Sequence, residues 1–111
     1  MIKHIVIWRL QDSAGGHDKA HNARLLKQRL EALNGKIPGL IRLEVGIDFS
    51  HDAHSGDVVL YSEFESRAAL QGYHDHPEHQ ALIPLLLELR SERRVVDYQV
   101  EHPQTIVRDR P

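Results

Sequence analysis

The sequence predicts an α+β domain with the ferredoxin-like order β-α-β-β-α-β, in which helices cover one face of an antiparallel four-stranded sheet. Three observations lead to this prediction. Four segments are rich in β-branched and apolar residues with a period of two, at 2–10, 41–47, 58–64 and 94–100. The segments between them repeat apolar residues at helical spacing. A chain of 111 residues has room for one such domain.

The first strand, residues 2–10, is apolar on both of its alternating faces. Ile5 and Ile7 share one face, and Val6 and Trp8 share the other. A polar, glycine-containing segment then leads into the first helix, which we predict over 18–34. Its stripe of apolar side chains recurs every three or four residues, at Ala23, Leu26, Leu30 and Leu33.

The next two strands differ in their patterns. Residues 41–47 follow a Pro-Gly turn and alternate strictly between apolar and polar side chains, which predicts one buried face. After a polar loop over 49–56, residues 58–64 are apolar on both faces, like the first strand. The first and third strands are therefore the predicted centre of the sheet.

Helices and a final strand complete the predicted order. Ser66 is a suitable N-cap for a short helix through Tyr73, and Pro77 is placed to begin a second helix. That second helix carries a leucine stripe through Leu89, with a kink expected at Pro84. Residues 94–100 read as the fourth strand, and a C-terminal tail follows over 101–111.

The central strands imply a partner. Helices can cover only one face of the sheet, yet both faces of these strands carry apolar side chains. An exposed apolar sheet normally marks an interaction surface, and a second copy related by a two-fold axis is the simplest cover. We therefore expect a homodimer with its sheets packed face to face.

The composition excludes several classes of protein. Lys and Arg number 14 against 16 Asp and Glu, a formal net charge of -2, so there is no global cationic field for nucleic acid. The absence of cysteine excludes disulfides, thiolate metal sites and cysteine nucleophiles. No apolar run approaches the roughly 20 residues of a membrane span, and the start lacks a signal-peptide pattern. We expect a cytoplasmic protein that binds neither nucleic acid nor membranes.

Five short motifs occur in a fixed order along the chain: Lys3-His4-Ile5-Val6, Ile37-Pro38-Gly39, Leu60-Tyr61-Ser62-Glu63-Phe64-Glu65-Ser66, Tyr73-His74-Asp75-His76-Pro77-Glu78-His79 and Val95-Val96-Asp97-Tyr98. Together they resemble the stress-responsive A/B barrel (Dabb) domain over residues 1–100. The resemblance implies a dimeric α+β barrel, in agreement with the homodimer expected from the strands. Among proteins of this kind, a plant polyketide cyclase closes a ring by aldol condensation without a cofactor. Its tyrosine and two histidines match Tyr73, His79 and His4.

The candidate catalytic residues are His79, Tyr73 and His4. A neutral imidazole can serve as a general base near neutral pH, and a turn between Tyr73 and His79 would fold the phenol towards that imidazole. In that geometry Tyr73 would hold His79 or donate to a developing enolate oxygen. The structural alternative is that His76 and His79 buttress a helix junction over the Tyr73 ring.

A substrate pocket is expected between the sheet and the helices. His4 shares a strand face with Val6 and Trp8, so its ring points into an apolar layer and needs a polar partner. We predict that Trp8, Phe64 and His76 line the pocket. The alternatives are that Trp8 and Phe64 are plain core residues and that His4 is a hydrogen-bonded interior histidine.

The chain has nine histidines, a residue type that commonly binds metal ions. His17 and His21 have i, i+4 spacing but no third ligand nearby, and His74, His76 and His79 straddle a proline turn. We therefore predict no metal site and no cofactor.

Three functions remain in competition. The first is a cofactor-independent lyase or cyclase that performs acid/base chemistry, aldol cyclisation or isomerisation, on a small apolar keto compound. The second is a non-catalytic stress-responsive module that binds a small apolar ligand or protects cells under stress, in which the same residues serve folding and side chains fill the pocket. The third is a haem-handling oxygenase, because related dimeric barrels use a histidine as an iron ligand.

Overall fold

The computed structural model describes residues 1–101 and has the predicted order of main elements. Strand β1 (Ile2–Leu10) is followed by helix α1 (Lys19–Glu31), strand β4 (Leu40–Ile47) and strand β5 (Val58–Phe64). Helices α2 (Arg67–Asp75), α3 (Pro77–Gln80) and α4 (Ile83–Leu89) then lead into strand β6 (Arg90–Gln99). A small hairpin of β2 (Ser13–Ala14) and β3 (His17–Asp18), which the sequence patterns did not predict, precedes α1. The predicted tail, apart from Glu101, lies outside the described residues.

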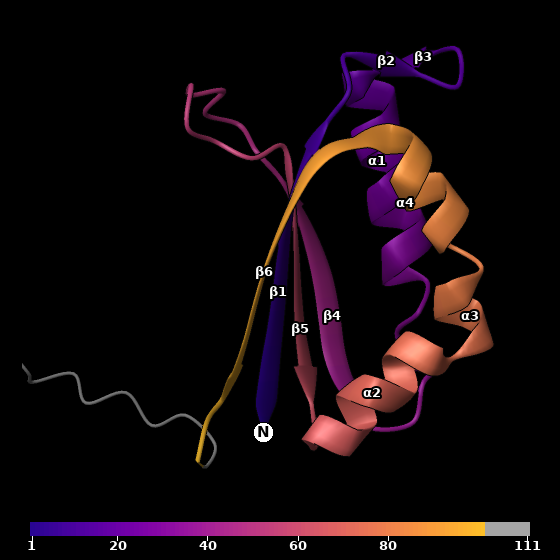
Figure 1. The fold of residues 1–111 in the computed structure, drawn as a ribbon, viewed down its shortest axis with the longest axis vertical. Coiled ribbons are helices and arrows are strands. Elements are labelled where there is room, and N and C mark those ends of the chain that lie inside the picture. The colour runs from indigo at the N-terminus through magenta and orange to yellow at the C-terminus, as the bar shows by residue number, and fades with distance from the viewer. Residues whose placement is uncertain (102–111) are drawn as a thin grey trace, which may run out of the picture.

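The sheet is antiparallel with the order β4-β5-β1-β6, so the two strands with two apolar faces are the central ones. Figure 1 shows the four helices together on one side of this sheet. This ferredoxin-like α+β arrangement confirms the predicted fold class. Within residues 1–101, no helix is both long and apolar enough to cross a bilayer.

Three predicted boundaries differ from the structure. Helix α1 ends at Glu31 instead of residue 34, and the chain continues through turns to Gly35, which has a positive φ of 80°. The helix expected after Pro77 is two helices, because the chain leaves helical order at Ala81 and Leu82 before Pro84 occupies the first turn of α4. Strand β6 begins at Arg90 instead of residue 94, since pairing with β1 extends through a stretch of charged residues.

Alternation along β1 divides the side chains between two environments. His4, Val6 and Trp8 point towards the helices and are buried. The opposite face of the sheet has no cover within one chain: Ile7 is 42% exposed, Val96 59% and Tyr98 43%. The central strands are therefore buried on one face only in a single chain, which leaves the apolar surface that the sequence predicts for a partner.

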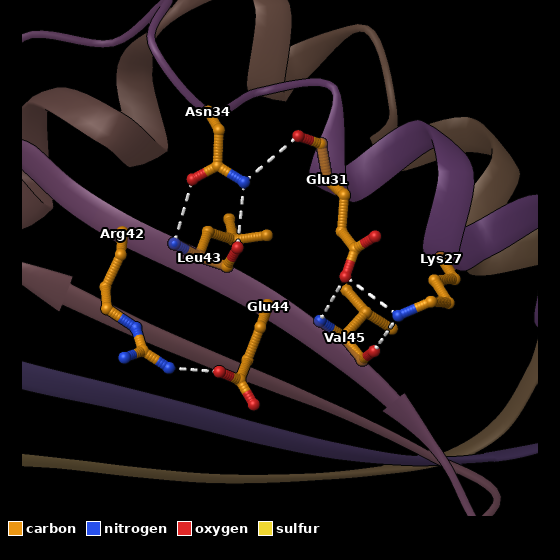
Figure 2. A network of polar contacts seen from close by, with 7 residues as sticks. All are labelled: Lys27, Glu31, Asn34, Arg42, Leu43, Glu44 and Val45. Atoms are coloured by element: carbon orange, nitrogen blue, oxygen red, sulfur yellow. Dashed lines mark hydrogen bonds and ion pairs between the residues drawn. The ribbon is translucent and has the colours of Figure 1, made fainter.

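The outer edge of β4 is occupied by side chains of α1 and its C-terminal turn (Figure 2). The amide of Asn34 pairs with both backbone groups of Leu43, donating to its carbonyl oxygen at 2.8 Å and accepting from its N–H at 2.9 Å. Glu31 accepts from the N–H of Val45 at 3.0 Å, and Lys27 donates to the Val45 carbonyl. These bonds satisfy the groups that an edge strand would otherwise offer to another strand.

Replacing Asn34 by Ala is expected to destabilise the protein by about 1–2 kcal/mol, because two backbone groups of β4 lose their partner and water replaces it only in part. Chemical denaturation at fixed protein concentration measures the loss. Gln28→Ala, an exposed change on the same helix, is the control and should stay within about 0.5 kcal/mol of the parent. Equal stability of the Asn34 and Gln28 variants would contradict this role.

Candidate functional site

A cavity of about 190 Å³ lies between the helix-facing side of the sheet and the last three helices. Strand β1 supplies one wall through His4, Val6 and Trp8. Its lining is otherwise apolar and basic: Leu30, Leu60, Tyr73, His74, His79, Ile83, Leu86, Leu87, Arg90 and Arg93. The volume is below the range of roughly 300–1,000 Å³ that is typical for drug-sized ligands, so the cavity suits a small molecule.

The break between α2 and α3 brings Tyr73 and His79 together. Helix α2 ends at Asp75, and His76 adopts an extended backbone conformation before Pro77 begins α3. The His76 imidazole accepts a hydrogen bond from the Glu78 N–H at 3.1 Å, which caps the new helix. One turn later His79 lies back over α2, and its ring centroid is 4.4 Å from that of Tyr73.

The Tyr73 hydroxyl is buried without a partner. The residue is 1% exposed, and its oxygen has no hydrogen bond within residues 1–101. Burial raises the pKa of the phenol well above its usual range. Tyr73 is therefore a neutral donor held against the cavity, and a ligand oxygen would give its hydroxyl the partner that it lacks.

His79 has the features of a neutral base. Its Nδ1 lies 3.2 Å from the His74 carbonyl oxygen, and because a carbonyl can only accept, Nδ1 carries the proton. The lone pair is then on Nε2. Burial lowers the pKa of His79, and the nearby His74, His4 and Arg93 lower it further, against the opposing effect of the His74 carbonyl.

His4 has the partner that its burial requires. Its Nδ1 bonds to the carboxylate of Asp97, which lies directly opposite on β6. The His4 ring also packs edge-on against Tyr73, with centroids 6.1 Å apart, and against His74 at 5.4 Å. Because the Asp97 carboxylate fixes Nδ1–H, the Nε2 atom of His4 is the ring nitrogen left for other contacts.

The structure therefore brings together His79, Tyr73, His4 and Trp8 of the predicted site residues. Phe64 and His76, which the sequence predicts in the pocket, are not in its lining. Phe64 is fully buried in the core and packs on the Tyr73 ring at 5.0 Å, while His76 serves as the helix cap.

Four cavity or supporting residues were missed: His74, Asp97, Arg90 and Arg93. His74 adjoins Tyr73 at the end of α2, where the helix break sets its direction. Asp97 and Arg93 lie opposite His4 and Trp8 across the β1–β6 pair. The alternation of side chains along β6 shows that Asp97 and Arg93 share one face. It shows that this face points towards the cavity only once the register with β1 is known.

Among residues 1–101, no three histidine or acidic side chains are grouped so that they could hold a metal ion. His17 and His21, the i, i+4 pair, stack with their ring centroids 3.8 Å apart. Their contact is with each other, at the hairpin that precedes α1 and away from the cavity.

Known proteins similar to this chain share its family and its fold. The family model of the stress responsive A/B barrel domain matches residues 2–100. An uncharacterised protein of Streptomyces coelicolor is 31% identical over 88 residues, which cover 79% of this chain and 89% of that protein. A dimeric protein of unknown function with a ferredoxin-like fold, from Bacteroides fragilis, is 33% identical with a TM-score of 0.78, covering 89% of this chain and 95% of that one.

An antibiotic biosynthesis monooxygenase shares the fold at greater distance. It is 20% identical, with a TM-score of 0.67 over 90% of this chain and 98% of that one. At this identity the similarity concerns the fold alone.

The buried imidazoles predict a loss of stability in mild acid. Because the pKa values of His74 and His79 are lowered in the folded chain, the unfolded chain binds more protons as the pH falls through about 6.5, the ordinary imidazole value. The free energy of unfolding should therefore decrease between about pH 7.5 and pH 5.5. Urea denaturation measures this decrease, which His79→Gln should make smaller. His54→Gln, in an exposed loop, should leave it unchanged, and an equal effect of the two variants would contradict the assignment.

Proposed function

The chain belongs to the stress responsive A/B barrel domain family, and from the geometry of its cavity we propose that it catalyses proton transfer on a small keto compound without a cofactor. One observation carries the proposal: Tyr73, whose buried hydroxyl has no hydrogen-bond partner within residues 1–101, packs its ring on the His79 imidazole, and both residues line a small, mostly apolar cavity. A buried donor without a partner is costly for a folded protein, so its retention favours a ligand oxygen at this place.

The proposed reaction begins with removal of a proton next to the substrate carbonyl. Nε2 of His79 takes the proton, the C–H electron pair moves into the new C=C bond, and the carbonyl oxygen becomes an enolate. Tyr73 donates a hydrogen bond to that oxygen, which stabilises the charge as it develops. The enolate carbon then attacks a second carbonyl of the same molecule, and the oxygen of that carbonyl takes the proton back from His79. Where the enolate is conjugated with a further double bond, a different carbon takes that proton instead. These outcomes are aldol cyclisation and isomerisation, respectively.

His4 and Asp97 act as a positioning pair in this proposal. The Asp97 carboxylate fixes the tautomer and the orientation of the His4 ring, whose edge contacts Tyr73 and His74. The pair therefore holds the His4 ring against the Tyr73 ring, next to Phe64, and leaves Nε2 of His4 for the ligand.

The two competing functions fit the cavity less well. The non-catalytic hypothesis expects side chains to fill the space near His79, whereas an open cavity of about 190 Å³ lies there. A haem macrocycle is larger than this volume accommodates.

Exchange of the hydrogens next to a carbonyl provides the test. In deuterated buffer, NMR of small ketones and keto acids should show catalysed exchange by the parent protein. His79→Gln should lower the rate by about 10²–10⁴ and Tyr73→Phe by about 10²–10³, because these variants lose the base and the oxyanion donor. His54→Gln should match the parent. If His79→Gln exchanges every compound as fast as the parent, His79 is not the base.

We further infer that the functional unit is a homodimer formed through the outer face of the sheet. This face carries Ile7, Val96 and Tyr98, all more than a third exposed in one chain. The edge of β4 is closed by α1, which favours contact through the face over pairing along this edge. The related protein of Bacteroides fragilis is itself described as dimeric.

The dimer is tested by placing a charge in the centre of this face. Val96→Glu is expected to shift the mass in sedimentation equilibrium from twice the chain mass to the chain mass at micromolar concentration, because a carboxylate would be buried without a partner. Arg24→Glu adds a carboxylate on the helix layer and should leave the dimer intact. A parent protein that sediments as a monomer would overturn the inference.

A further inference from the structure

Two arginines face the cavity without an acidic partner. Arg93 lies directly opposite Trp8 in the β1–β6 register, and Arg90 lies opposite Leu10. Both line the cavity, and neither forms an ion pair within residues 1–101. Arg90 is half-buried and Arg93 is exposed. Guanidinium groups that line a cavity and have no acidic partner are able to bind the carboxylate or phosphate of a ligand.

The charged side chains that line the cavity are all positive. Its ionisable groups are two guanidinium groups, the imidazoles of His4, His74 and His79, and the Tyr73 phenol, with no acidic side chain among them. The Asp97 carboxylate, which is outside the lining, accepts from His4. The charge of Arg93 reaches the interior, since it contributes to the lowered pKa values of His74 and His79. The cavity therefore favours an anionic ligand over a neutral or cationic one.

A third donor lies beside the arginines. The indole of Trp8 is 3% exposed, and its Nε1–H is buried without a hydrogen-bond partner within residues 1–101. Because Trp8 and Arg93 are cross-strand neighbours on the helix-facing side, their side chains leave the sheet next to each other, and both line the cavity. A ligand bound to Arg93 therefore lies beside the Trp8 side chain.

We propose that this part of the cavity binds the carboxylate of a small, otherwise apolar acid, with Arg93 and Arg90 as the counter-charges and the Trp8 indole as a neutral donor. The inference names the substrate class for the proposed function and rests on it: the substrate is a keto acid. Nothing in the family assignment specifies this class, and it follows from the two arginines and the two unpartnered donors.

The register also orients the acid. The Trp8–Arg93 pair lies four residues along β1 from the His4–Asp97 pair, which is about 13 Å of strand between their Cα atoms. With the carboxylate at the arginines, the body of the acid passes Val6 and Leu86, and its carbonyl meets Tyr73 and His79. The anion-binding end and the proton-transfer end are therefore separate parts of one cavity.

A carboxylate fits these donors better than a phosphate group. The planar fork of a guanidinium matches the two oxygens of a carboxylate, and the indole contributes one further donor. A phosphate dianion brings a third oxygen and a larger desolvation cost into a cavity of only about 190 Å³. The proposal commits to a carboxylate.

The sole tryptophan of the chain is Trp8, so its fluorescence reports binding directly and without turnover. Octanoate, methyl octanoate and octyl phosphate are the probes, titrated into the full-length protein. Octanoate should change the emission saturably and bind at least about tenfold more tightly than the ester, because a charged hydrogen bond contributes more than about 1.4 kcal/mol. Equal binding of octanoate and the ester, no saturable binding of octanoate, or tighter binding of octyl phosphate would overturn the proposal.

Substitutions assign the effect to the arginines. Arg93→Gln and Arg90→Gln should each weaken octanoate binding, by about tenfold or more for Arg93, and leave the ester unaffected. Arg93→Lys keeps the charge and should restore part of the affinity. Arg24→Gln removes the same charge from the exposed face of α1 and should leave binding unchanged; a loss equal to that of Arg93→Gln would reduce the effect to net charge and overturn the assignment. The melting temperature of each variant shows that it is folded.

The result is separable from the proposed catalysis. Arginine-dependent binding of octanoate without exchange of any ketone supports the carboxylate site and contradicts the proton-transfer role. Exchange of neutral ketones with no preference for octanoate over its ester supports the proton-transfer role and contradicts the carboxylate site, because His79 would then act without an anion site.

Discussion

The period-two alternation of β1 is the constraint on which the rest of the molecule depends. It sends His4, Val6 and Trp8 towards the helices and leaves Ile5 and Ile7 on the open face. The strand is paired on both sides, by β5 and by β6, so its register is fixed twice. A slip of one residue would move the imidazole and the indole out of the cavity and bury Lys3 and Arg9 in their place. The register of β1 thus determines both the fold and the lining of the cavity.

The helix layer covers an edge of the sheet that would otherwise be open to another strand. Helix α1 closes the edge of β4 with the amide of Asn34 and the Lys27–Glu31 pair, whose nitrogen and oxygen are 2.9 Å apart. The hydrogen bonds from Lys27 and from the Val45 N–H lower the pKa of Glu31, so its carboxylate stays charged at neutral pH. With this edge occupied, a partner finds exposed apolar side chains on the open face of the sheet, at Ile7, Val96 and Tyr98. The cavity lies on the helix-facing side of the sheet. A partner bound to the open face would therefore not cover the helices that enclose the cavity.

The sequence predicts those parts that depend on periodicity and local chemistry. The alternation of β1 and β5 places them at the centre, and the Pro77 turn predicts the approach of Tyr73 and His79. The run from Arg90 to Arg94 has no apolar alternation, so its strand character follows only from pairing with β1. Arg93 and Asp97 became site residues through that register, which no local pattern reveals. His76 has the residue type of a site histidine, but the helix start takes its imidazole as a cap.

Burial acts on Tyr73 and His79 in opposite directions, and this leaves the proposed catalytic pair without a net charge. A desolvated phenol resists losing its proton, so its pKa rises, whereas a desolvated imidazole resists gaining one, so its pKa falls. The proton therefore stays on the tyrosine and the lone pair stays on the histidine over a wide range of pH. The resting pair has no charge for an anionic ligand to neutralise, and the fixed positive charge of the cavity lies with the arginines. In the proposed reaction, the imidazolium and the enolate form together when a proton moves to His79, beside a donor that is already in place.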